Sequence, residues 1–99
     1  MTLAVWLIAA VAFIAIGLDI YFSERAYAKG AIEADETLRD LFGDRPKAWQ
    51  LAIENTVWAA PLIVALFWTD YRMQSFGVAW GAVVAIKHLI GANKARKLA

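Results

Sequence analysis

The sequence predicts an all-α membrane protein, a bundle of three transmembrane helices with a short amphipathic helix between the first two. Hydrophobic residues make up 62% of the chain and charged residues 19%, whereas soluble domains have about 45–50% and about 25%. The apolar residues also gather in three long runs, at about 2–22, 49–68 and 75–92. A soluble fold of this length has too little interior to bury them, so we expect residues 1–99 to form one membrane domain.

Length favours helices over strands for these three runs. At about 1.5 Å per residue, about 20 helical residues cross the roughly 30 Å of hydrocarbon in a bilayer. An isolated strand in lipid would leave its backbone groups without hydrogen-bond partners. We therefore predict three helical spans.

The distribution of Lys and Arg predicts the direction of the spans. The connector 23–48 carries five of these residues and the tail 93–99 carries three, whereas the turn between the second and third spans has Arg72 alone. Basic residues concentrate in the cytoplasmic loops of membrane proteins. We therefore expect the connector and the basic tail in the cytoplasm and the N-terminus outside, in a membrane of the bacterial inner (cytoplasmic) type.

The connector 23–48 is too long for a bare turn and has a helical pattern of its own. Asp35 and Arg39 are four residues apart, the spacing of an ion pair on a helix, and Gly43 suits the position after a helix end. Apolar residues recur at spacings of three and four: Ala31, Ala34, Leu38, Leu41 and Phe42. The sequence predicts an amphipathic helix at about 30–42, whose apolar face packs on the bundle or on a neighbouring subunit.

Polar residues interrupt all three runs at nearly the same depth, close to the cytoplasmic side. Asp19 lies about one turn before the inner end of the first run, Glu54 and Asn55 lie one to two turns into the second, and Lys87 and His88 lie one to two turns before the end of the third. A charge at the centre of a membrane helix costs about 2.5–3.5 kcal/mol. We therefore expect these residues to face one another as a polar layer inside the bundle.

Three interpretations of this layer stay open. A nearly neutral network would hold the helices in register. A proton or ion relay would use His88 as its titrating group. An interfacial enzyme would use Glu54 or Asp19 as a general base and Lys87 to bind a phosphate or carboxylate. Because Lys87 adjoins the candidate ligands, we expect no metal site; we also expect no cofactor and assign no catalytic residue.

Small residues mark faces where helices can approach closely. Gly77 and Gly81 have the small-xxx-small spacing of packed membrane helices. In the first run, small residues recur at steps of three along the face that leads to Asp19: Ala9, Ala12 and Ala15. These faces suit packing within one chain or between chains. Pro61, in the middle of the second run, predicts a kink that can act as a hinge.

Composition excludes several function classes. The net charge is +1, and no basic stripe with interleaved aromatic residues suggests nucleic-acid binding. Without cysteine, the chain has no disulfide framework and no thiolate metal site. Three helices enclose little interior, and a polar layer has to be shielded from lipid by protein. We therefore expect the lipid bilayer as one partner, and further copies of the chain (a homo-oligomer) or a partner membrane subunit as the other. The predicted function is a structural or accessory membrane subunit.

Two alternative functions remain, an oligomeric pore or ion pathway and a small interfacial enzyme. Three spans, an outside N-terminus and a basic tail within 99 residues together resemble the layout of phage class I holins, which oligomerise into membrane lesions. That resemblance implies a pore former. It is a resemblance of layout, and the long amphipathic connector departs from the short loop that is usual in holins.

Overall fold

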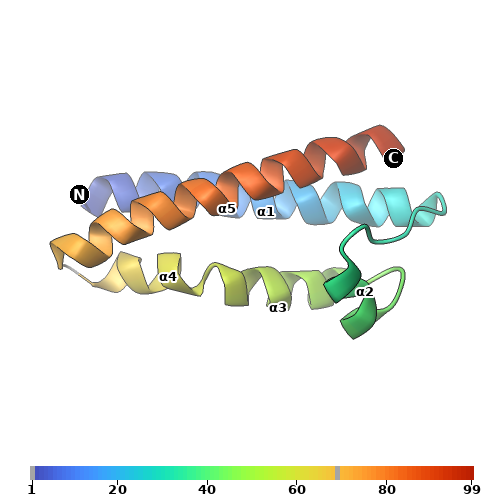
Figure 1. The fold of residues 1–99 in the computed structure, drawn as a ribbon. Coiled ribbons are helices and arrows are strands. Elements are labelled where there is room, and N and C mark those ends of the chain that lie inside the picture. The colour runs from blue at the N-terminus through green and yellow to red at the C-terminus, as the bar shows by residue number, and fades with distance from the viewer. Residues whose placement is uncertain (1, 69) are drawn as a thin grey trace.

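The computed structural model describes residues 2–68 and 70–99, which form helices and loops without a strand. The helices are α1 (Thr2–Ala28), α2 (Glu36–Phe42), α3 (Ala48–Trp58), α4 (Ala60–Phe67) and α5 (Tyr71–Leu98). Figure 1 shows an elongated bundle, 45 × 24 × 17 Å, along which the chain passes three times. The predicted all-α bundle is thus confirmed.

Two of these helices, α1 and α5, are long and apolar enough to cross a membrane, and a third span exists if α3 and α4 count as one. Helices α3 and α4 meet at Ala59 with a bend of 57°. Pro61 lies two residues beyond the bend, and its ring nitrogen has no hydrogen to donate to the Val57 carbonyl four residues back. At the same break the Trp58 carbonyl accepts a hydrogen bond from the indole Nε1 of Trp80, at 2.7 Å.

Both long helices extend beyond the predicted spans, 2–22 and 75–92. The predicted tail 93–99 is therefore helical almost to its end. Ala26 and Ala95 are buried in these added turns, so the turns pack on the bundle. Basic side chains in the last turn of α5 also interact favourably with the helix dipole.

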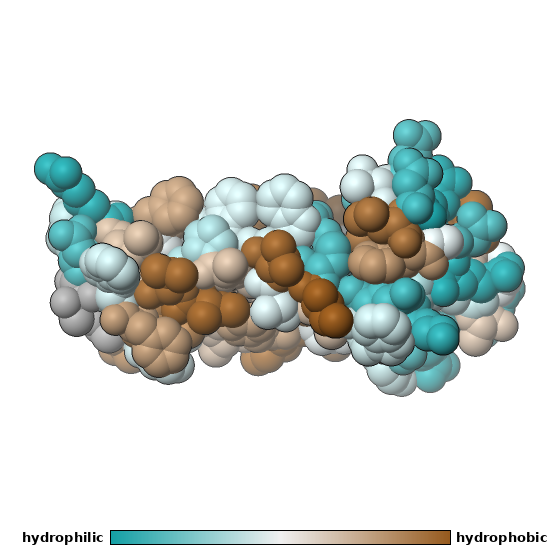
Figure 2. Space-filling model, turned by 90° about the horizontal axis from the view of Figure 1, so that it is seen from below, coloured by the Kyte–Doolittle hydropathy of each residue, from teal (hydrophilic) through white to brown (hydrophobic). Residues whose placement is uncertain are grey.

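The outer surface of the bundle is largely apolar, as a membrane helix requires. Many large hydrophobic side chains are exposed on every long helix, among them Leu7 on α1, Ile53 on α3 and Ile86 on α5. Figure 2 views the side formed by α3 and α4: apolar side chains spread over the middle of this face, and hydrophilic ones gather at the connector end. In water such a surface would drive aggregation.

Helices α1 and α5 pack against each other along most of their length, and α4 packs on both. Helix α3 packs on α1 instead, and Figure 1 shows α5 rising away from it toward the C-terminus. The core between the packed helices is apolar: Val5, Ala9, Ala12, Ile16, Ala59, Leu62, Ala65, Val84 and Ala85. The bend at Ala59 therefore divides the second pass into a tightly packed half and a splayed half.

The small residues singled out in the sequence lie inside this single chain. A Cβ atom on Gly77 would overlap the Ala65 Cβ atom of α4, and one on Gly81 would lie 2.8 Å from Cγ2 of Ile8. The three alanines of α1 are also buried: Ala9, Ala12 and Ala15. Packing within the chain thus uses both small-residue faces.

The connector helix is shorter than the predicted 30–42, because α2 begins only at Glu36. Gly30 has φ +101°, a left-handed conformation that ends the helical path after α1. The loop that follows is tied back by Arg45, whose guanidinium donates to the carbonyls of Gly30 and Ala31 at 3.2 and 3.3 Å. This part of the connector is an ordered loop over the end of the bundle rather than a helix.

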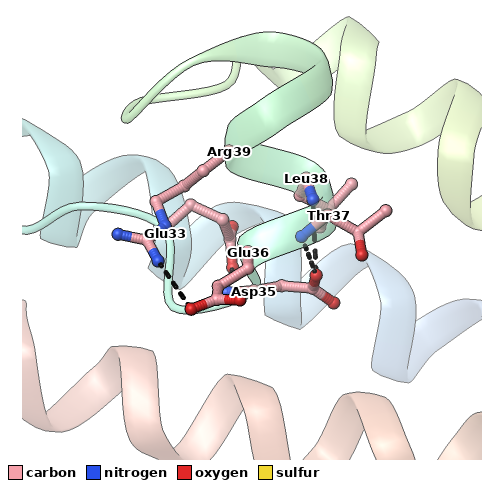
Figure 3. A network of polar contacts seen from close by, with 6 residues as sticks. All are labelled: Glu33, Asp35, Glu36, Thr37, Leu38 and Arg39. Carbon is pink, nitrogen blue, oxygen red and sulfur yellow. Dashed lines mark hydrogen bonds and ion pairs between the residues drawn. The ribbon is translucent and has the colours of Figure 1, made fainter.

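Asp35 caps the start of α2 instead of pairing with Arg39 as the spacing predicted. Its carboxylate accepts the backbone N–H groups of Thr37 and Leu38, at 2.9 and 3.3 Å (Figure 3). Arg39 forms a 3.9 Å ion pair with Glu36. An Asp before the first helical turn satisfies N–H groups that have no partner within the helix, which outweighs one exposed ion pair.

Candidate functional site

A cavity of about 430 Å³ lies at the end of the bundle that carries the connector and the C-terminus. It is bounded by α1, α3 and α5, and connector residues 31–35 and Leu38 also line it. All members of the predicted polar layer line this one cavity: Asp19, Glu54, Asn55, Lys87 and His88. The cavity exists because α3 diverges from α5 at this end, beside the polar residues.

Asp19 and His88 form the buried centre of the site. The Nδ1 atom of His88 lies 2.7 Å from Oδ2 of Asp19, and the two side chains are 4% and 21% exposed. Ser23, one turn along α1, donates to Oδ1 of the same carboxylate at 3.4 Å. With Nδ1 donating to Asp19, a neutral imidazole presents Nε2 as a hydrogen-bond acceptor.

Gly91 makes room for this pair, a role that sequence reasoning missed. A Cβ atom at Gly91 would lie 2.9 Å from Oδ2 of Asp19. Gly91 follows Lys87 by four residues and therefore lies one turn farther along the same side of α5. That spacing could have predicted the role of Gly91, because a glycine one turn from a polar layer lets a side chain from another helix approach closely.

Helix α3 supplies Glu54 and Asn55 to the opposite wall of the cavity. Asn55 is 5% exposed, whereas Glu54 is half-buried. Within residues 2–68 and 70–99, the ion pairs closer than 4.0 Å are Arg39–Glu36 and His88–Asp19, so Glu54 belongs to neither. Its carboxylate lines the cavity, where Lys87 and His88 act on it electrostatically and the Trp58 side chain is a hydrogen-bond neighbour.

Lys87 lies at the edge of the cavity and is exposed rather than enclosed in the bundle. Its Nζ atom sits 5.6 Å from the centre of the Trp58 ring, a cation–π distance. Successive residues on a helix point about 100° apart. Because His88 points into the bundle, its neighbour Lys87 has to point toward the rim beside α3.

The connector covers the cavity at the end of the bundle where the C-terminus lies. The Tyr27 hydroxyl donates to the Glu33 carboxylate, and the Glu33 N–H donates to the Asp44 carbonyl at 2.7 Å. Lys29 also donates to the terminal Ala99 carbonyl. These hydrogen bonds link the connector, α1 and α5 at this end of the bundle.

At the opposite end Gln74, which the sequence analysis did not single out, is a third buried polar residue besides Asn55 and His88. It is 2% exposed, and its amide nitrogen donates to the carbonyls of Ala65 and Trp68. These contacts hold the end of α4 to the start of α5. The signal in the sequence was a polar residue one turn before Gly77, on the same helix face.

In the part of the chain that the structure describes, no group of three or more His, Asp or Glu side chains is arranged to hold a metal ion. Comparisons with protein-family models, with curated proteins and with solved structures find no match to this chain. The arrangement of the site, a two-signed polar cavity with an apolar exterior around it, is therefore the basis for a functional proposal.

Proposed function

We propose that this chain is a small integral membrane subunit that crosses a bacterial cytoplasmic membrane three times, with α3 and α4 together as the second span. Supporting this, the connector and the C-terminus lie at the same end of the bundle and the N-terminus at the other (Figure 1). The connector and tail carry eight of the ten Lys and Arg residues, and the opposite turn carries Arg72. By the positive-inside rule the end with the cavity is cytoplasmic.

The subunit packs with copies of itself or with a larger membrane complex through the outer face of α3. The observation that carries this proposal is an open groove of about 280 Å³ lined by Ala52, Ile53, Thr56 and Val57. Ala52 and Thr56 form a small-xxx-small pair on the exposed side of the helix. The Thr56 hydroxyl donates to the Ala52 carbonyl at 2.7 Å, so the groove offers another helix a surface without an unpaired hydroxyl.

The packing inside the chain supports this choice of face. Gly77 and Gly81, the small-xxx-small pair singled out in the sequence, are buried against α4 and α1. The small residues Ala52 and Thr56 of α3, by contrast, stay exposed to a neighbouring helix. The apolar core between Gln74 and His88 also favours a subunit over a polar pathway through a single chain.

Filling the groove tests the proposal. In Ala52→Leu, the added side chain blocks the close approach of a neighbouring helix, and we expect the dissociation constant of the assembly to rise about tenfold. Native mass spectrometry in mild detergent measures the populations of monomer and assembly. The matched control is Ala79→Leu, on an exposed position of α5, which should leave the assembly unchanged. A wild-type chain that is monomeric, without any co-purifying subunit, contradicts the proposal.

A further inference from the structure

The cavity beneath the connector has walls of opposite charge. One wall carries hydrogen-bond acceptors from α3, the Glu54 carboxylate and the Asn55 amide oxygen. The facing side is α5, where Lys87, Gly91, Lys94 and Leu98 line the cavity. These residues follow at steps of three and four and so share one helix face. A bound molecule would meet acceptors on one side and two ammonium groups on the other.

The remaining acidic groups of the lining are already engaged. Glu33 accepts from Tyr27 and from the Asp35 N–H group, Asp35 caps α2, and Asp19 is paired with His88. Neither Lys87 nor Lys94 is in an ion pair within the described residues. Glu54 and the two lysines are therefore the charges that a ligand can neutralise.

The rest of the lining is apolar and lies at membrane depth. Helices α1 and α5 have the length and hydropathy of membrane spans, and the cavity occupies their connector end, where lipid headgroups meet the hydrocarbon. Four large aliphatic side chains of α1, α3 and α5 line it beside the polar groups: Ile20, Leu51, Ile90 and Leu98. A volume of about 430 Å³ is in the range of small-molecule sites.

We propose that this cavity binds the zwitterionic headgroup of an aminophospholipid, with its primary ammonium at Glu54 and Asn55 of α3 and its phosphate at Lys87 and Lys94 of α5. A primary ammonium has three N–H donors for the acceptors of the α3 wall. Lysine binds phosphate as a point charge. The acyl chains extend along the aliphatic residues into the bilayer. The inference rests on the membrane placement proposed above, and it does not depend on the α3 groove.

The test compares lipids that differ in one group at a time. Purified full-length protein in mild detergent is titrated with short-chain phosphatidylethanolamine, phosphatidylcholine and phosphatidylglycerol, and bound lipid is counted by native mass spectrometry. We expect phosphatidylethanolamine to bind about tenfold more tightly than phosphatidylcholine, whose ammonium has no N–H group to donate. Phosphatidylglycerol should also bind more weakly, because it has no cation for Glu54. Equal binding of all three lipids overturns the proposal.

Two variants assign the preference to residues. Glu54→Gln should lower phosphatidylethanolamine binding to the phosphatidylcholine level, whereas Glu24→Gln, an exposed carboxylate outside the cavity, should keep the preference. Lys94→Gln should weaken both lipids equally by removing a phosphate partner, and its exposed position leaves the fold intact; Lys97→Gln is its control. A phosphatidylethanolamine preference that survives Glu54→Gln contradicts the assignment.

The same experiment tests whether the headgroup alone is recognised, and it also measures the mass of the assembly. Soluble phosphoethanolamine should displace the lipid better than phosphocholine does, since the polar contacts belong to the headgroup; equal displacement overturns the ammonium assignment. The same spectra report the assembly mass. Ala52→Leu is expected to change that mass and keep the lipid preference, so failure of the subunit proposal is distinguishable from failure of the lipid site.

Discussion

The two ends of this bundle differ in how closely the second pass lies against the other two. Around Gly77, α4 and α5 come so close that a single Cβ atom would overlap Ala65. Around His88, α3 leaves a cavity of about 430 Å³ beside α1 and α5. Polar groups are enclosed to different degrees. Gln74 is 2% exposed, with its amide nitrogen held by two carbonyls and its Oε1 atom unpaired among the described residues, whereas Glu54 is half-buried at the cavity.

The bend at Ala59 explains this difference. A straight helix through α3 and α4 would keep one crossing angle to α5 along its entire length. The 57° bend lets α4 follow α5 closely while α3 diverges from it. Close packing and the cavity therefore lie in different halves of the second pass.

The largest expected effect breaks the close-packed end. In Gly77→Val, the side chain would overlap Ala65, a contact that only backbone movement can relieve. We expect a loss of about 3 kcal/mol in the free energy of unfolding, measured by denaturant titration in detergent. Gly17→Val is the matched control, because a Cβ atom at Gly17 would meet nothing within 4 Å. Equal losses in the two variants would show that helix packing at this end is not close.

A smaller effect is expected at the cavity end, where Asp19 and His88 depend on each other. Asp19→Ala leaves the 4% exposed imidazole without its partner, and we expect a loss of about 2 kcal/mol in unfolding free energy. The double variant Asp19→Ala/His88→Leu should regain most of it, because no buried polar atom is then left unpaired. Asp44→Ala, on the exposed connector, is the control. Additive losses in the double variant would contradict a direct coupling.

Hydropathy and spacing predicted the helical bundle and the grouping of polar residues near one end, because both follow from the cost of placing charge in lipid. They did not predict which member of each adjacent pair points inward. Glu54 and Asn55 are sequence neighbours, as are Lys87 and His88, and neighbours on a helix point about 100° apart. Only the packed structure decides that Asn55 and His88 are buried and that Lys87 lies at the rim.

The connector was the hardest part to predict, since its pattern is compatible with helix from residue 30 onward. Gly30 adopts φ +101° and the Asp35 carboxylate caps the next helix, so the helical segment starts later than the apolar spacing indicated. Carbonyl contacts from Arg45, a residue outside the periodic segment, hold the loop. Long-range hydrogen bonds of this kind leave no periodic signal in a sequence.

The smallest expected effect concerns the bend itself. Trp80→Phe keeps the aromatic ring near its stacking partner Phe76 but removes the N–H group that reaches the Trp58 carbonyl at 2.7 Å. An unsatisfied carbonyl at a helix break should cost about 1 kcal/mol of unfolding free energy. Trp6→Phe, at an exposed position on α1, controls for loss of the indole.

If the bend depends on this bond, Trp80→Phe should also speed hydrogen exchange at the Leu62 amide, which donates to the Ala59 carbonyl at the break, while exchange at the start of α3 stays unchanged. Uniform exchange in both variants would mean that Pro61 alone maintains the bend, and the division between the two ends would then be a property of the backbone rather than of the Trp58–Trp80 contact.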